Sequence, residues 1–158
     1  MSGYDFTGVL LAIHIAPEAS APMVELGAAR LVEGVGIEGD RYATARGTYS
    51  HKPHPDRQVT LIEMEALDAL TRDHGIDLPP HETRRNLTTG GVPLNHLVGR
   101  EFRVGEVVLL GGRLNVPCQY LEDLLGKKVF KPLIHRSGLN CLIVKGGTIR
   151  PGDSVRPV

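Results

Sequence analysis

The first residue that could do chemistry is Cys118, in the run Arg-Leu-Asn-Val-Pro-Cys-Gln-Tyr-Leu-Glu over residues 113–122. An apolar run from Val107 to Leu110 precedes it, and a helix-like segment follows. A cysteine directly after a proline, between a strand and a helix, would lie among unpaired backbone N–H groups, which favour the thiolate. A thiolate is both a nucleophile and a metal ligand. The alternative is that Cys118 is a small buried hydrophobic residue.

Two further residues bear on this thiol. His135 could orient or deprotonate Cys118, since histidine can activate a cysteine in this way. The alternative for His135 is a strand histidine that is hydrogen-bonded to the backbone. Cys141 lies in an apolar run over residues 140–145, which favours a place in the core. The two cysteines lack the paired spacing of a zinc site, so we expect reduced thiols in a cytoplasmic protein, while a bridge between them stays open.

Four short polar groups combine arginine or asparagine with glycine or a strand end. Guanidinium groups bind phosphate and carboxylate oxygens in a bidentate manner, and adjacent turns supply backbone N–H donors. If the groups converge, they would bind a phosphorylated or otherwise anionic ligand. Each could instead be solvated or structurally paired, and Asp40-Arg41 could be an ion pair that fixes a turn. The candidate cofactor-binding residues are Asp40, Arg41, Arg57, Gln58, Arg85, Asn86, Arg136 and Ser137.

Two other motifs carry less weight. His51, His54 and Asp56 have side chains that bind zinc, but two prolines make this segment stiff and extended, so the imidazoles need not face the same way. The glycines of residues 34–39 match a dinucleotide-binding pattern. That pattern requires a helix directly after the glycines, and no apolar helical stripe follows here.

The elements that must position these residues are mostly short strands. Alternating or continuous apolar runs predict strands at 9–15, 24–32, 57–62, 106–110, 113–116, 133–135, 140–145 and 153–156, with a β-prone segment at 82–91. Apolar residues recur at helical spacing from Met64 to His74, and Gly75 fits a left-handed stop. So many strands and so little helix predict a mostly β fold, a closed β-barrel with one or two helices, because closure removes exposed sheet edges.

The composition excludes several classes of function. The chain has 158 residues, which suits one domain over 1–158, and it carries 18 acidic and 18 basic residues. This balance gives no global charge for nonspecific binding to nucleic acid or to an anionic membrane. Aromatic residues make up 4% and tryptophan is absent, which argues against stacking on nucleic-acid bases. The amino-terminal residues do not resemble a signal peptide, and no apolar stretch is long enough to span a bilayer.

The order and spacing of these motifs resemble the MOSC domain, which is named for the carboxy-terminal domain of molybdenum cofactor sulfurases. The resemblance extends from Val9 to Val155, and its specificity comes from the whole ordered set. The motifs are Gly39-Asp40-Arg41-Tyr42, Gly47-Thr48-Tyr49-Ser50, the run Arg-Gln-Val-Thr-Leu-Ile-Glu at 57–63, Arg85-Asn86-Leu87-Thr88, Leu97-Val98-Gly99, Pro117-Cys118, Leu121-Glu122, His135-Arg136-Ser137-Gly138-Leu139, Gly146-Gly147 and Gly152-Asp153.

The resemblance implies a predominantly β fold built on a barrel, of the MOSC or pyruvate-kinase-barrel type. It also implies a role for Cys118, either as a carrier of sulfur in a persulfide or as a ligand to the molybdenum of a bound pterin cofactor. A thiolate suits both roles, since it is a good nucleophile and a soft ligand. The arginine and asparagine groups would then hold the phosphate of the pterin.

The sequence departs from the family pattern in two ways. Many standalone relatives have Cys-Glu before Pro-Cys, whereas this chain has Asn115-Val116. The pyridoxal-phosphate desulfurase domain of the sulfurases is also missing, so we expect no pyridoxal phosphate site and no release of sulfur from cysteine by this chain alone. A cysteine desulfurase or an electron-donor protein would be the expected partner.

Three functions follow as expectations. The first is binding of molybdenum cofactor or a sulfurated metal species, with Cys118 as ligand or sulfur carrier. The second is a noncatalytic module that delivers cofactor to a partner, in which Cys118 is a packing or contact residue. The third is a reductase of N-hydroxylated compounds that uses bound cofactor and receives electrons from outside, because the sequence has no flavin or iron–sulfur motif.

Overall fold

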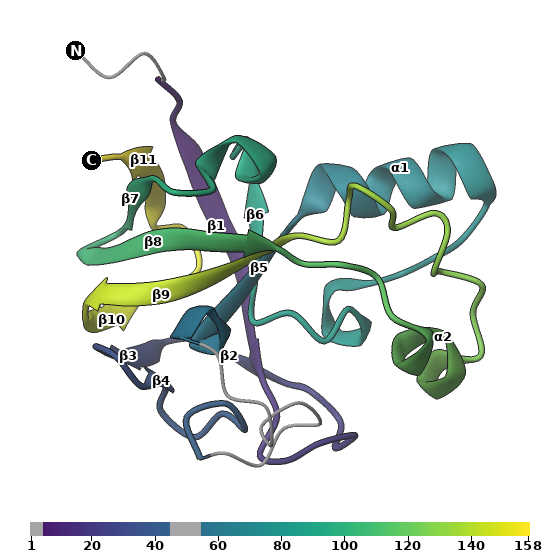
Figure 1. Ribbon diagram of the computed structural model, residues 1–158, viewed down its shortest axis with the longest axis horizontal. Coiled ribbons are helices and arrows are strands. Elements are labelled where there is room, and N and C mark those ends of the chain that lie inside the picture. The colour runs from purple at the N-terminus through teal and green to yellow at the C-terminus, as the bar shows by residue number, and fades with distance from the viewer. Residues whose placement is uncertain (1–4, 45–54) are drawn as a thin grey trace.

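The computed structural model describes residues 5–44 and 55–158. Within them the strands are short and are joined by turns, two α-helices and three short 3₁₀ helices (Figure 1). The elements in chain order are β1 (Gly8–Ile15), β2 (Val24–Leu26), β3 (Ala29–Val32), β4 (Gly36–Ile37), η1 (Pro55–Arg57), β5 (Val59–Glu63), α1 (Met64–His74), η2 (Pro80–Glu82), β6 (Leu87–Gly90), η3 (Leu94–Leu97), β7 (Glu101–Val104), β8 (Val107–Leu114), α2 (Gln119–Leu125), β9 (Leu139–Lys145), β10 (Gly147–Ile149) and β11 (Ser154–Pro157).

Seven strands close into a barrel in the order β11-β7-β8-β9-β5-β6-β1, and β1 pairs back to β11. Six of these neighbours are antiparallel, and β5 and β6 are parallel. A ring with an odd number of strands cannot alternate direction throughout, so it needs a parallel pair. Helix α1 provides the crossover between β5 and β6 that such a pair requires. The predicted mostly β fold, a closed barrel with two helices, is confirmed.

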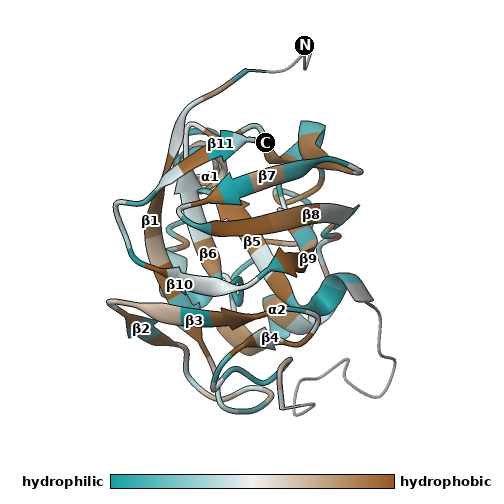
Figure 2. Ribbon diagram, turned by 90° about the vertical axis from the view of Figure 1, so that its left-hand side faces the viewer, coloured by the Kyte–Doolittle hydropathy of each residue, from teal (hydrophilic) through white to brown (hydrophobic). Residues whose placement is uncertain are grey.

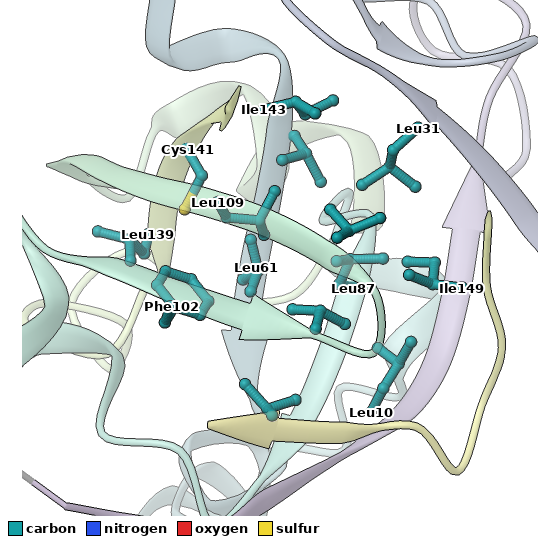
Figure 3. Packing of buried hydrophobic residues seen from close by; sticks show 14 of the residues in the cluster. Leu10, Leu31, Leu61, Leu87, Phe102, Leu109, Leu139, Cys141, Ile143 and Ile149 are labelled. Atoms are coloured by element: carbon teal, nitrogen blue, oxygen red, sulfur yellow. The ribbon is translucent and has the colours of Figure 1, made fainter. Parts of the chain in front are cut away.

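The barrel interior holds the main core. Leu61 on β5, Leu139 on β9 and Phe102 on β7 are fully buried and belong to one apolar cluster. Their side chains point inward from different walls, as Figure 3 shows. Cys141 lies in the same cluster, so its predicted place in the core is confirmed. Because strand side chains alternate, the neighbours of these residues face the outside of the barrel.

A second apolar cluster lies outside the barrel, where both helices pack. Ile62 faces outward from β5 and contributes to this cluster with Leu70 of α1 and Leu121 of α2. Figure 1 shows the two helices on the same side of the barrel. Gly75 ends α1 in the left-handed conformation, with φ of 65°, as its sequence predicted. Neither helix is long and apolar enough to cross a membrane, within the residues described.

Three predicted strands were wrong. The run 24–32 is two strands, because β2 pairs with β1 while β3 joins a separate sheet of order β10-β3-β4 (Figure 2). Residues 113–116 form no strand of their own, since β8 continues to Leu114. Residues 133–135 form a turn. Leu133 inserts into the outer cluster from that turn, and a short apolar run does not distinguish this from a strand.

Candidate functional site

Cys118 lines a pocket of about 340 Å³ on the outer wall of the barrel. Strand register explains the location, because Thr60 of β5 pairs with Asn140 of β9, and Asn140 pairs with Arg113 of β8. The side chains on either side of Thr60 and Asn140 point into the barrel core, so these two face outward. The pocket therefore lies across three neighbouring strands, and β8 leads from it directly to Cys118. Its lining residues are Tyr42, Arg57, Thr60, Arg85, Arg113, Leu114, Asn115, Val116, Cys118 and Asn140.

The backbone of Cys118 is extended, and the residue occupies the cap position before α2, with φ of −133° and ψ of 151°. Its side chain makes no capping hydrogen bond. The half-buried thiol also packs against the outer apolar cluster that contains Leu121. One side of Cys118 therefore packs against apolar side chains, and the residue also lines the pocket.

Arg85 is the hub of a hydrogen-bond network beside the thiol. Its Nη2 donates to Oδ1 of Asn115 at 2.6 Å and to Oγ of Ser137 at 2.8 Å, while its Nε donates to the carbonyl of Ser137 at 2.9 Å. Asn115 in turn donates through Nδ2 to Oδ1 of Asn140 at 2.7 Å. Arg85 as a whole is 7% exposed. This network fixes the segment that leads from β8 to Cys118.

Arg113 also lines the pocket and is held by Asp56. Its Nε lies 2.6 Å from Oδ2 of Asp56, and its Nη2 lies 3.0 Å from Oδ1. Asp56 is 2% exposed, whereas the Arg113 side chain is half exposed. The hydrogen bonds that Arg113 donates to this carboxylate raise the pKa of the guanidinium group. A side chain at Gly112 would collide with Asp56, so the glycine before Arg113 is required for this pair.

Asn86 anchors the strands below the pocket. Its Oδ1 accepts from the backbone N–H of Thr60 at 3.0 Å, and its Nδ2 donates to the carbonyl of His14 at 3.1 Å. The side chain is completely buried. Asn86, which directly precedes β6, therefore links β5 to β1. Its bond to Thr60 also holds one of the residues that line the pocket.

Asp40 and Arg41 form a buried turn next to the pocket. Oδ1 of Asp40 accepts from the backbone of Ala16 at 3.0 Å and from Nη1 of Arg41 at 3.1 Å. Arg41 also lies over the ring of Tyr42, 4.4 Å from its centroid, and Tyr42 lines the pocket. The ion pair fixes this turn, which was the predicted alternative to a role of Asp40 and Arg41 in ligand binding.

Arg84 adds a second buried cation to this turn. It has a φ of 64°, and its Nη1 donates to the carbonyl of Ala21. Burial, and then the charge of Arg41, lower the pKa of Arg84. Two buried guanidinium groups therefore lie near one carboxylate, that of Asp40, which leaves an excess of positive charge beside Tyr42.

The remaining candidate residues lie elsewhere among the described residues. The side-chain carbonyl of Gln58 accepts from the backbone of Ile143 at 2.7 Å. Arg136 forms an ion pair with Asp73 at 3.3 Å on the surface. His135 is exposed, has a φ of 66°, and accepts through its carbonyl from Asn95. None of the three candidates appears in the lining of the Cys118 pocket, while Ser137 acts through its contacts with Arg85.

Sequence reasoning missed several pocket residues. Arg113 could have been found, because it opens the same ten-residue run as Cys118 and follows two glycines. Asn115 was interpreted only as the loss of a family residue, whereas it connects Arg85 to Asn140. Thr60 and Asn140 gave no signal, since their roles come from strand pairing.

The predicted zinc ligands are only partly within the described residues. His51 and His54 lie outside them, and Asp56 pairs with Arg113. In the described part of the chain, no group of three or more histidine, cysteine, aspartate or glutamate side chains could hold a metal ion.

The comparisons with known proteins agree with this fold. The family model of the MOSC domain matches residues 48–156. No curated protein matches the sequence. The structure is similar to the YuaD protein from Bacillus subtilis, with a TM-score of 0.82 and 17% identity over 97% of this chain and 96% of that one.

Two YiiM structures are also similar. The one from Geobacillus stearothermophilus has a TM-score of 0.71 and 13% identity, over 96% of this chain and 75% of that one. The one from Escherichia coli has a TM-score of 0.69 and 17% identity, over 95% and 69%. At these identities the structural likeness concerns the fold alone. The match of the family model to most of the sequence shows that the chain belongs to the MOSC domain family.

Proposed function

We propose that the Cys118 pocket binds molybdenum cofactor or a sulfurated metal species, with the Cys118 thiolate as ligand to the metal or as carrier of the sulfur. The MOSC family is associated with molybdenum cofactor. The observation that carries the proposal is a half-buried thiol in one pocket with Arg57, Arg85 and Arg113. A thiolate is a soft ligand that suits molybdenum and sulfur, and guanidinium groups suit phosphate.

The residues present fit such a cofactor. A volume of about 340 Å³ lies within the range of about 300–1,000 Å³ that is usual for small-molecule sites. Three arginines in the lining, Arg57, Arg85 and Arg113, supply the positive charge that supports binding of a phosphate. When bound, the cofactor would supply a redox-active metal centre. The protein would supply the thiolate ligand, the phosphate contacts and, through Asn115 and Arg85, a fixed segment before Cys118.

In the carrier role, Cys118 would receive sulfur from a partner of the cysteine desulfurase class. The Cys118 thiolate would attack the outer sulfur of the donor's persulfide, forming a new S–S bond as the donor's own S–S bond breaks. The donor leaves as a thiolate with the electron pair, and the Cys118 persulfide keeps the transferred sulfur. The cytoplasm suits this role, because thiols stay reduced there.

A delivery module is the second candidate. Val116 and Leu114 line the pocket and are 73% and 39% exposed. Exposed apolar side chains at the mouth of a site favour contact with a partner protein. In this role Cys118 would contact the cofactor during transfer, and the chemistry would take place on the partner. A reductase role would need an electron-donor protein as the partner instead.

Metal loading tests the ligand role. The protein and its Cys118→Ala variant are produced in cofactor-replete cells, and bound molybdenum and pterin are measured. The ligand role predicts molybdenum in the wild type and a loss of at least tenfold in Cys118→Ala. Cys141→Ala is the matched control, since it removes a thiol from the barrel core and should keep its loading if it remains folded. Equal loading of wild type and Cys118→Ala would exclude the ligand role.

Persulfide formation tests the carrier role. Wild type and Cys118→Ala are incubated with a cysteine desulfurase and cysteine, and intact masses are recorded. The carrier role predicts the mass of one added sulfur on the wild type only, located on Cys118 by peptide mapping. A desulfurase that loads a known acceptor but leaves this protein unmodified would exclude the carrier role.

A further inference from the structure

Arg113 lines the pocket and has one guanidinium nitrogen, Nη1, that remains available to a ligand. Its Nε and Nη2 are both engaged by Asp56, at 2.6 and 3.0 Å. Its Nη1 makes no hydrogen bond to any described residue, and the side chain is half exposed where it lines the pocket. Arg85 differs, because all of its nitrogens donate to protein oxygens. Arg113 can therefore still take a ligand without giving up a bond.

Asp56 holds the side chain of Arg113 in a fixed position. Asp56 is almost completely buried and contacts Arg113 in a bidentate manner, which fixes the plane of the guanidinium group. Gly112 leaves the space for the Asp56 side chain. A buried carboxylate that holds an arginine at a pocket wall orients the positive charge toward the pocket.

We infer that Arg113 is a specificity-determining residue, which selects reactants and ligands of Cys118 that carry an oxyanion next to the reacting atom. The oxyanion would accept from Nη1 of Arg113 while Asp56 holds the opposite edge of the guanidinium group. Sulfonates, carboxylates and phosphates share this chemistry. The inference rests on the proposed function only in taking Cys118 as the reacting group, and it requires neither molybdenum nor pterin.

Paired alkylating reagents test this selection on the protein without cofactor. Iodoacetate carries a carboxylate and iodoacetamide is its neutral analogue. In both cases the Cys118 thiolate forms a C–S bond, and the C–I bond breaks as iodide leaves with the electron pair. The measured quantity is the ratio of the two rate constants at Cys118, normalised to the same ratio for glutathione. Any change in thiolate population cancels, because both reagents react with the thiolate.

The normalised ratio should be high in the wild type and should fall about threefold in Arg113→Gln, which is the effect of one unit charge at about 6 Å in water-like surroundings. Added salt should lower the wild-type ratio toward that of the variant. Arg103→Gln is the matched control, since it removes an exposed arginine from β7 and should leave the ratio unchanged. An unchanged ratio in Arg113→Gln would overturn the inference, as would an equal fall in Arg103→Gln.

A second variant covers loss of folding, because Arg113→Gln removes the bidentate contact of the buried Asp56 with Arg113. The double variant Asp56→Asn with Arg113→Gln replaces the ion pair by a neutral one, and it should also lower the ratio. A folded double variant with the wild-type ratio would overturn the inference. The alkylation result is independent of the molybdenum-loading experiment. A protein that binds no molybdenum can still show a lower alkylation ratio in Arg113→Gln, and a protein that binds molybdenum can show an unchanged ratio.

Discussion

Nη2 of Arg85 lies 2.6 Å from Oδ1 of Asn115, and this contact joins the residues just before β6 to the segment that carries Cys118. The two residues are 30 positions apart in the sequence and come together because only β9 and β5 lie between β8 and β6 in the barrel. The side-chain amide of Asn115 links Arg85 to Asn140, since it accepts a hydrogen bond from Arg85 and donates one to Asn140.

Asn115→Ala should lower the free energy of unfolding by about 1–3 kcal/mol, because it removes an acceptor from a buried guanidinium group. Chemical denaturation measures this loss. Asn95→Ala is the matched control, since its amide makes one exposed bond to the carbonyl of His135 and should cost less than about 1 kcal/mol. Equal losses in the two variants would mean that the Arg85 network does not stabilise the fold.

Gly138→Ala should lower the free energy of unfolding by about 2–4 kcal/mol. Gly138 has a φ of 99°, and a side chain there would collide with the carbonyl oxygen of Leu61. Gly27→Ala is the control, because no atom lies within 4 Å of a side chain at that position, and its effect should stay within about 0.5 kcal/mol. A thermal or urea melt of Gly138→Ala that matches the wild type would contradict this account of the motif glycine.

The two cysteines should react at very different rates. Cys141 is 0% exposed, and burial, followed by the charge of Asp56, raises the pKa of its thiol. Cys118 opens to the pocket. Iodoacetamide should therefore label Cys118 in the folded protein, and Cys141 only after unfolding. Peptide mapping by mass spectrometry measures the labelling of each cysteine. Comparable labelling of both thiols under native conditions would contradict the burial of Cys141 in the barrel core.

Stability should fall as the pH falls below about 6.5, the usual pKa of histidine. Burial lowers the pKa of His14 in the folded state, while Glu25 acts to raise it and His81 to lower it. The unfolded chain then binds more protons than the folded one between the two pKa values, so acid favours unfolding.

The slope from this one group is at most about 1.4 kcal/mol per pH unit. His14→Leu removes the titrating group, and the Nδ1 of His14 has no hydrogen-bond partner among the residues that the structure describes. The variant should show a flatter dependence of unfolding free energy on pH between about 7 and 5. Urea titrations at several pH values measure it, and slopes that do not differ from the wild type would assign the acid sensitivity to other groups.

The sequence by itself determined the features that depend on local patterns and motif order. The apolar spacing from Met64 to His74 with Gly75 predicted α1 and its end, because helix periodicity and a left-handed stop are local. The number of short apolar runs predicted a closed barrel, since closure is the way to avoid open edges. Motif order indicated the MOSC family and drew attention to Cys118.

The tertiary structure alone decided which polar groups meet. Arg85 and Arg136 both follow family motifs, yet Arg85 reaches the pocket and Arg136 pairs with Asp73 on the surface. Strand register places Arg113 at the pocket, and its side chain is held there by Asp56, which lies 57 positions away in the sequence. Such contacts depend on strand register and on the outward faces of three strands, and both arise when the barrel closes. No local pattern encodes them, because each partner comes from a different wall.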